Sequence, residues 1–149
     1  EAEKTLSLVS NQIPFSMVNR GIEEETVPYC IENNKSILAY SPLERGLLTG
    51  KITTDYKFQE GDHRAKLPHF QPEFIEKTNQ LLDKIKLITE KHNGSLGQLV
   101  LRWTIERPGI TIALAGARNA EQAVQNAKAI DINLSKEEIQ TIDQLVNTF

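Results

Sequence analysis

The sequence predicts an α/β fold in which parallel strands alternate with helices. Three short apolar runs are separated by helix-compatible segments, which is the order typical of strand–helix–strand units. Each run also ends in polar or small residues, at positions 10–12, 40–41 and 116–119. Because ligands of parallel α/β folds bind beyond the carboxyl ends of the strands, the same pattern predicts a binding site at this edge.

The first half of the chain contains two of the strands. The first is expected within residues 6–17, and an acidic helix-compatible segment follows at residues 21–34, which Pro28 must bend or interrupt. The second strand is expected at residues 36–43. The polar stretch at residues 53–71 has about the length at which loops are usually functional or mobile.

Two helices are predicted after that loop. Apolar residues recur every three or four positions over residues 72–92, which indicates a long amphipathic helix. Ser95 and Gln98 have the spacing of a capping box for a second helix at residues 96–107. This second helix is apolar on most sides, so we expect it to be deeply buried.

The third strand, at residues 109–116, leads into the last helices. Asn119 is expected to cap a helix over residues 120–129, together with Gln122. A second capping box, Ser135 with Glu138, precedes the final helix. No repeat, low-complexity tract or linker interrupts the sequence, so residues 1–149 are expected to form one compact unit.

Composition limits the classes of function. A net charge of −3 argues against nucleic acid as the main partner, because phosphate binding needs clustered Lys and Arg. No apolar run approaches the roughly 20 residues that span a bilayer. The single cysteine, Cys30, suits a reducing compartment, so a cytoplasmic location is expected. The only methionine is Met17, so we expect a piece of a longer protein, with N-terminal processing or tag removal as the alternative.

The segment "LAGARNAEQAVQN" is the most informative candidate site. A strand ends at Gly116, Arg118 follows, and a capped helix begins directly afterwards. A helix N-terminus suits a phosphate, Arg118 adds a bidentate donor, and Gly116 allows close approach to the backbone. The alternative is an ordinary strand–helix turn with a solvated arginine.

The stretch "YSPLERGLLTGK" offers a second set of binding groups. Tyr40 could stack on a planar cofactor, Ser41 can form hydrogen bonds, and Gly46 and Gly50 permit tight turns whose amides could surround a pyrophosphate. The alternative is that Tyr40 is a core aromatic residue.

At the end of the first strand, Gln12 carries both amide functions needed to pair with a carboxamide. Asn11 must point to the opposite face of the strand. The alternative here is a solvated strand end.

Groups for metal binding or catalysis are not evident. The three histidines, His63, His69 and His92, lack ligand spacing, and Cys30 is expected to be inert. Asp62 and Arg64 could hold the loop at residues 53–71 closed. We find no acid/base pair and no Ser/His/Asp arrangement, so the sequence carries groups for binding rather than for catalysis.

Several segments, in register, resemble the C-terminal half of an aldo-keto reductase. They are "SNQIPFSMVNRGIEEETVPYCIEN", "ILAYSPLERGLLTGK", "GDHR", "GQLVLRW", "RPGI" and "LAGARNAEQAVQNAKA", and together they cover essentially the whole chain. The resemblance implies a partial (β/α)8 TIM barrel, a C-terminal half-barrel fragment holding the sixth to eighth strand–helix units. It also implies hydride transfer from NADPH, in preference to NADH, to a small aldehyde or ketone.

The resemblance also implies which residues bind the cofactor. Gln12 would hold the nicotinamide carboxamide and Tyr40 would stack on its ring. The pyrophosphate would be lined by Ser41, Leu43 and Gly46, and the adenosine with its 2′-phosphate by Gly116, Arg118, Gln122 and Asn126. Glu44 replaces a glycine of many members, so its charge must face away from the pyrophosphate. Gln122 replaces an arginine of some branches, so a preference for NADPH depends mainly on Arg118.

The family's catalytic Asp, Tyr, Lys and His lie on earlier strands and have no counterpart here. We therefore assign no catalytic residue, and expect the chain alone to be inactive. An alternative is a non-catalytic, nucleotide-sensing partner subunit, similar to the potassium-channel β subunits. Three strands of a barrel would leave apolar surface and strand edges uncovered, so we expect the chain to self-associate, to pair with its missing half, or to repack.

Overall fold

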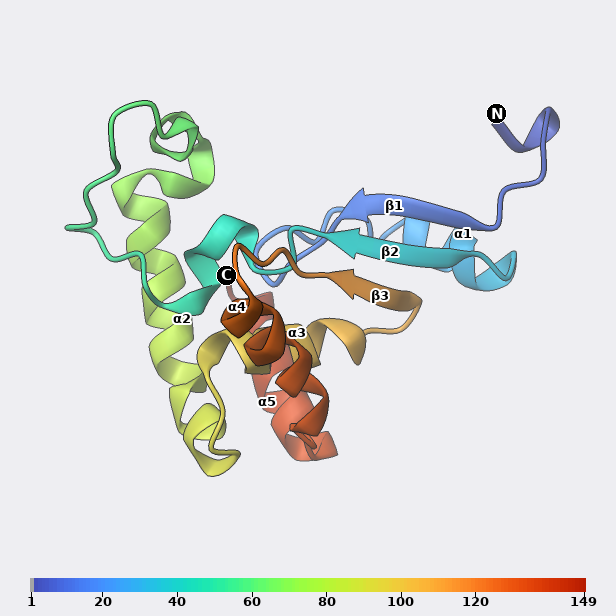
Figure 1. The fold of residues 1–149 in the computed structure, drawn as a ribbon. Coiled ribbons are helices and arrows are strands. Elements are labelled where there is room, and N and C mark those ends of the chain that lie inside the picture. Colours follow the sequence, from blue (N-terminus) through green and yellow to red (C-terminus); the bar gives the residue numbers. More distant parts are fainter. Residues whose placement is uncertain (1) are drawn as a thin grey trace.

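A three-stranded parallel sheet forms the centre of the computed structural model, which describes residues 2–149. The strands are β1 (Ser10–Pro14), β2 (Ser36–Tyr40) and β3 (Ile110–Leu114), in the order β1-β2-β3. All three arrows point the same way in Figure 1. The predicted α/β fold with parallel strands is confirmed.

Helices connect and flank the strands. The α-helices are α1 (Thr26–Glu32), α2 (Pro72–Lys91), α3 (Leu96–Ile105), α4 (Ala120–Ala127) and α5 (Lys136–Asn147). Short 3-10 helices are η1 (Ala2–Lys4), η2 (Glu44–Thr49), η3 (His63–Lys66), η4 (Pro68–Phe70) and η5 (Lys128–Asp131).

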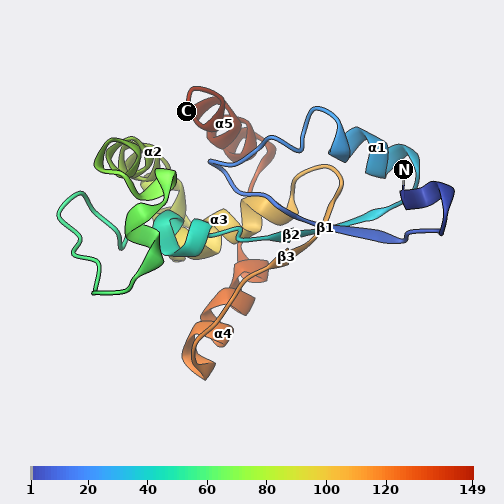
Figure 2. The same ribbon diagram turned by 90° about the horizontal axis from the view of Figure 1, so that it is seen from above.

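One face of the sheet carries the main core. Seen from above, α1, α3 and α5 lie on one side of the sheet, whereas α4 projects from the other side near β3 (Figure 2). Ile37 and Ala39 of β2 are fully buried on the covered face. They belong to a cluster in which the indole of Trp103 on α3 stacks on the ring of Phe15, with 6.0 Å between ring centroids.

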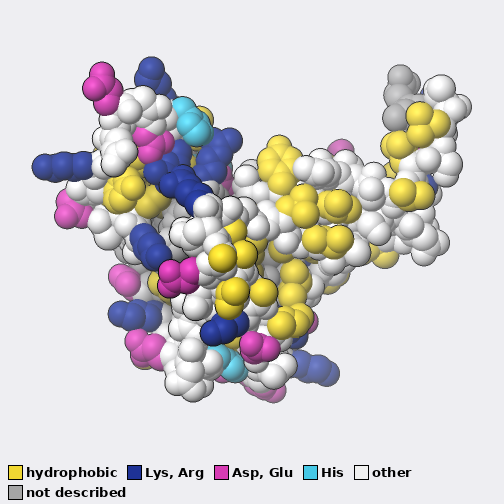
Figure 3. All heavy atoms as spheres, viewed as in Figure 1, with side chains coloured by type: hydrophobic (Ala, Val, Ile, Leu, Met, Phe, Trp, Pro, Cys, Tyr) yellow, Lys and Arg dark blue, Asp and Glu magenta, His cyan; other side chains and the backbone are white. Residues whose placement is uncertain are grey.

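The opposite face of the sheet has no such cover. Hydrophobic side chains gather over the strands on the side seen in Figure 3. Ile112 is 46% exposed, and Tyr40 and Leu114 are also exposed. Side chains that normally lie in a core therefore remain open to solvent on this face.

Both predicted capping boxes are present. The Ser95 hydroxyl accepts from the backbone N–H of Gln98, whose side chain accepts from the Ser95 N–H; Ser135 and Glu138 do the same. The buried residues of α3 include Leu99, Val100 and Trp103, as its apolar sequence predicted.

Several elements differ from the sequence-based expectation, and β2 and β3 are shorter than the expected strands at residues 36–43 and 109–116. β1 occupies only Ser10–Pro14 of the apolar run at residues 6–17, because its ladder extends only as far as β2 supplies partners. Pro28 does not interrupt a helix that starts near residue 21. Instead α1 begins at Thr26, which places Pro28 in the first turn, where a missing backbone N–H costs no helical hydrogen bond.

A second, smaller core holds the segment after β2. Leu47 of η2, Ile52, Phe70 of η4 and Ile75 of α2 pack together. The loop at residues 53–71 is therefore anchored to η2 and α2 by buried side chains.

Candidate functional site

Gln12 and Tyr40 lie on the same, uncovered face of the sheet. The strand register pairs Gln12 with Leu38, and Pro14 with Tyr40, so residues 12, 14, 38 and 40 share one face. Both Gln12 and Tyr40 are exposed, with Tyr40 at 39%. Asn11 pairs with the buried Ile37 and so belongs to the opposite face, as strand alternation predicted. The ring of Tyr40 is thus not a core aromatic.

The turn after β2 has an unusual backbone. Ser41, Glu44 and Arg45 have φ angles of 57°, 44° and 52°, and Gly46 has 98°. This left-handed region costs a residue with a side chain about 1–2 kcal/mol, so three such residues need contacts that hold them there. Only glycine adopts the angle of Gly46 without strain. Residues 41–46 are called the β2 turn below.

The carboxylate of Glu44 faces into the protein. It accepts a hydrogen bond from the Ser16 hydroxyl at 3.1 Å and lies 3.1 Å from Nδ1 of His69. Glu44 is only 8% exposed and Ser16 is fully buried. The negative charge therefore lies beneath the β2 turn and not on its open side. This is the orientation expected if a pyrophosphate binds at the turn.

The loop between β3 and α4 forms the second part of the carboxyl edge. The Asn119 side chain accepts from the N–H of Gln122, which confirms the predicted cap. The Arg118 N–H donates to Oε1 of Gln122 at 2.8 Å, and Asn126 Nδ2 donates to the Gly116 carbonyl at 3.1 Å. Gln122 and Asn126 thus shape this loop from the side of α4.

Two features make this loop accessible to a ligand. A Cβ atom added to Gly116 would meet no atom within 4 Å, so the space beside its backbone is open. Arg118 is exposed, and no residue in the described range 2–149 forms an ion pair with its guanidinium. This loop and the β2 turn both lie at the arrowhead end of the sheet (Figure 1).

Sequence reasoning missed three residues around the β2 turn. Ser16 was not singled out, because a buried serine after a strand has no signal until its partner Glu44 is known. Arg45 is exposed at the strained turn and adds a positive charge there. His69 was treated only as a metal-ligand candidate, whereas it contacts the Glu44 carboxylate.

The loop at residues 53–71 shows the Asp62–Arg64 pair suggested by the sequence. Nη2 of Arg64 lies 2.7 Å from Oδ2 of Asp62, and Nη1 of Arg64 donates to the Arg45 carbonyl at 3.1 Å. Hydrogen bonds from the Arg64 side chain and backbone lower the pKa of Asp62 to about 2.

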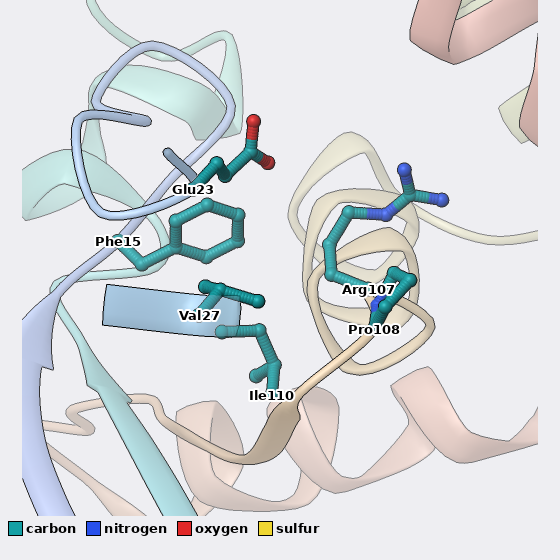
Figure 4. A pocket seen from close by; sticks show the side chains of 6 residues that line it. All are labelled: Phe15, Glu23, Val27, Arg107, Pro108 and Ile110. Carbon is teal, nitrogen blue, oxygen red and sulfur yellow. The ribbon is translucent and has the colours of Figure 1, made fainter. Parts of the chain in front are cut away.

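A pocket elsewhere does not belong to this site. It has a volume of about 170 Å³ and lies where α1 faces the end of α3 (Figure 4). Its lining residues are Phe15, Glu23, Val27, Arg107, Pro108 and Ile110. The two charged members are already paired, Glu23 with Arg20 and Arg107 with Asp143, and only Nε of Arg107 is buried without a hydrogen-bond partner.

Other candidate chemistries find little support in the geometry. Across residues 2–149, no three His, Cys, Asp or Glu side chains gather as metal ligands do. Burial raises the pKa of the Cys30 thiol, which keeps it protonated and unreactive. None of the helices in the described part of the chain is long and apolar enough to cross a membrane.

The model of the Aldo/keto reductase family matches residues 1–147. The chain belongs to this family. The recognition made from the sequence motifs is thereby confirmed, and with it the fold class, because a solved aldo-keto reductase barrel aligns with nearly the whole chain. That structure is a glycerol dehydrogenase from Gluconobacter oxydans, 32% identical, with a TM-score of 0.88 over 98% of this chain and 44% of that one.

Two curated aldo-keto reductase relatives differ in the cofactor that their names give. The NADH-specific methylglyoxal reductase of Escherichia coli is 36% identical over 83% of this chain and 37% of its own length. A Schizosaccharomyces pombe aldo-keto reductase named for NADP(+) is 33% identical over 87% of this chain and 38% of its own length. The chain thus spans about two fifths of these proteins. Both names are those of reductases that use a nicotinamide cofactor.

Proposed function

We propose that the chain forms the cofactor-binding part of an aldo-keto reductase that reduces aldehydes or ketones with NADPH. The observation that carries this proposal is the shared face of Gln12 and Tyr40. Both lie on the uncovered side of the sheet, and the strands that bear them end beside the β2 turn. This combination provides an amide, a flat ring and a sharp turn at one edge. The backbone N–H groups of Glu44 and Gly46 already donate within that turn, to the carbonyls of Ser41 and Leu43.

The nicotinamide end of the cofactor would bind on the sheet. The Gln12 side chain can donate to and accept from a carboxamide, and the exposed ring of Tyr40 can stack on the nicotinamide. Gln12 lies two residues before Pro14, the strand partner of Tyr40, so Gln12 is farther than Tyr40 from the carboxyl edge of the sheet. The amide would therefore contact the far end of a ring stacked on Tyr40.

The pyrophosphate would lie against the β2 turn, lined by Ser41, Leu43 and Gly46. Two charges support this placement. Glu44 is buried under the turn, so its carboxylate does not face the phosphates. Arg45 is exposed on the same turn and can supply a positive charge to them.

The adenosine and its 2′-phosphate would lie at the loop before α4. The open space beside Gly116 lets a ligand approach the backbone, and the guanidinium of Arg118 can bind a phosphate. Gln122 and Asn126 would hold this loop and line the adenosine. Because relatives named for NADH and for NADP(+) both occur, the preference for NADPH depends on Arg118.

When bound, the reduced nicotinamide supplies a hydride to a substrate carbonyl carbon. The residues of this chain would orient the ring that carries it, with Gln12 fixing the carboxamide and Tyr40 covering one face. No residue of this chain is assigned to proton transfer, so we propose that the proton donor lies outside residues 1–149. The reducing conditions implied by the single free Cys30 support a cytoplasmic enzyme.

The test is a titration of the full reading-frame product with NADPH and with NADH, following the fluorescence of the reduced nicotinamide. Arg118→Ala should weaken NADPH binding by about 10- to 100-fold, because a charge-assisted contact to phosphate contributes about 1.5–3 kcal/mol. NADH binding should change little. Arg102→Ala is the matched control, since Arg102 lies on the buried helix α3 and donates to the Ile130 carbonyl.

Two results would count against the proposal. Failure of the wild-type protein to bind either dinucleotide would refute it. Equal loss of NADPH and NADH affinity in Arg118→Ala would refute the assignment of the 2′-phosphate. NADPH binding without reduction of any of a panel of small aldehydes and ketones would instead favour the nucleotide-sensing alternative.

A further inference from the structure

Two side chains from the loop at residues 53–71 contact the β2 turn. His69, at the end of that loop, lies 3.1 Å from the Glu44 carboxylate beneath the turn. Arg64 donates from Nη1 to the Arg45 carbonyl at 3.1 Å. His69 thus contacts Glu44 and Arg64 contacts Arg45, and both contacts come from outside the turn.

Arg64 is itself held rigidly. Its Nε lies 3.0 Å from Oδ1 of Asp62 and its Nη2 lies 2.7 Å from Oδ2, so the pair is bidentate. The guanidinium also lies over two aromatic rings, 5.6 Å from the centroid of Phe58 and 5.9 Å from that of Phe70. Asp62 binds Nε and Nη2 of Arg64, and the aromatic rings pack against its guanidinium. The remaining nitrogen, Nη1, donates to the Arg45 carbonyl.

The anchoring continues into the smaller core. Phe70 packs with Leu47 of η2, and the His69 ring stacks on Phe74 of α2 with 4.6 Å between centroids. A Cβ atom at Gly46 would lie 3.9 Å from Nη1 of Arg64. The guanidinium therefore lies directly against the left-handed part of the β2 turn.

We propose that Arg64 is a positioning residue for dinucleotide binding, which sets the conformation of the β2 turn before any ligand arrives. This inference rests on the function proposed above, because the β2 turn is where the pyrophosphate would bind. Arg64 need not touch the cofactor. Its hydrogen bond to the Arg45 carbonyl adds to the hydrogen bonds within the turn, from the N–H groups of Glu44 and Gly46 to the carbonyls of Ser41 and Leu43, in holding the left-handed backbone. A preformed turn binds its ligand more tightly because less ordering is needed on binding.

The experiment compares wild-type, Arg64→Ala and Arg64→Lys forms of the full reading-frame product. Arg102→Ala is a close control, because Arg102 also pairs with a carboxylate, that of Glu106, and also donates to a backbone carbonyl, that of Ile130. Amide hydrogen exchange is measured without ligand at residues 44–48. Dissociation constants are measured for NADPH and for 2′-AMP, which lacks the pyrophosphate.

Arg64→Ala is expected to speed exchange at residues 44–48 and to raise the dissociation constant for NADPH about 10-fold, while 2′-AMP binds as to wild type. Arg64→Lys should give an intermediate loss, since an ammonium cannot form the bidentate fork. Arg102→Ala should change none of these quantities. The split between NADPH and 2′-AMP separates positioning of the turn from a general loss of folding.

Unchanged exchange at residues 44–48 in Arg64→Ala would overturn the inference, whether or not a dinucleotide binds. An equal loss for NADPH and 2′-AMP would also overturn it, because the effect would not be confined to the turn. If the wild-type protein binds no dinucleotide but Arg64→Ala still speeds exchange at residues 44–48, the proposed function is wrong. Arg64 would then stabilise the β2 turn without a role in dinucleotide binding. The two failures are thus distinguishable.

Discussion

Glu44 lies in the turn proposed to receive a pyrophosphate, and yet its charge is compatible with that role. Its left-handed backbone turns the carboxylate inward, where the Ser16 hydroxyl and the His69 ring meet it. Arg45, the next residue, stays exposed. Two neighbouring side chains of opposite charge are therefore separated by the backbone of the turn, the acid on the inside and the base on the outside.

Asp62 provides a pH test at the residue scale. Its pKa falls from 3.8 to about 2 in the folded protein, because Arg64 donates from its side chain and backbone to the carboxylate. The lowered pKa means that Asp62 contributes stability above about pH 4, and that this contribution disappears as the pH falls toward 2. The stability difference between wild type and Asp62→Asn should therefore be constant near neutral pH and shrink between pH 4 and 2.

Urea unfolding midpoints of the two proteins, measured at intervals from pH 2 to 6, give this difference directly. A difference that stays constant across the whole range would contradict the proposed Asp62–Arg64 linkage.

At the scale of elements, helix starts are set by local sequence. Ser95 and Ser135 each accept from the backbone N–H three residues later and lie at the start of α3 and α5. Replacing either with alanine should lower the free energy of unfolding by about 1 kcal/mol, within a range of 0.5–2 kcal/mol. Thermal or urea unfolding measures the loss.

Ser7→Ala, at an exposed position outside any helix, is the control and should have no effect. A loss of stability as large in Ser7→Ala would show that the effect is not due to capping.

The elements also show what sequence could predict and what it could not. Caps such as those of Ser95 and Asn119 follow from residues three positions apart, so they were predictable. The length of β1 depends on the partners that β2 offers, so the apolar run at residues 6–17 overpredicted it. The burial of Glu44 depends on Ser16, which lies 28 residues away in the sequence, and local spacing carries no signal for such a contact.

In the candidate site too, features set by neighbouring residues could be predicted, whereas those set by distant contacts could not. Strand alternation predicted that Gln12 and Asn11 face opposite sides, and the register placed Gln12 with Tyr40. The exposure of Tyr40 was not predictable from the residues alone, because it depends on which sheet face the helices cover. Only the resemblance to a family could suggest that this face is the inside of a barrel.

At the scale of the whole molecule, the surface is larger than that of a compact monomer. The accessible area is 9385 Å², whereas a folded chain of 16.8 kDa should expose about 7,700 Å². The excess agrees with the bare sheet face seen in Figure 3 and with β1 and β3 as open edges of the sheet. Uncovered apolar surface and open strand edges favour association.

We expect residues 1–149, produced by themselves, to self-associate through this face. Light scattering should report a mass at least twice 16.8 kDa, with strong binding of a hydrophobic dye. Replacing both Ile112 and Leu114 with threonine should lower the dye signal and the mass, since threonine keeps strand propensity and removes apolar surface.

Leu87→Gln is the control, because Leu87 is 70% exposed on α2, away from the sheet, and should have no effect. A monomeric species with little dye binding would contradict this expectation.

The carboxyl edge of the sheet is the place where we propose that a nicotinamide dinucleotide binds. Amide hydrogen exchange of the full reading-frame product, with and without saturating NADPH, tests it most directly. Binding at this edge should slow exchange at residues 40–46 and 115–126 and leave the pocket between α1 and α3 little changed. Protection confined to that pocket, or no protection of the two segments while NADPH is bound, would contradict it.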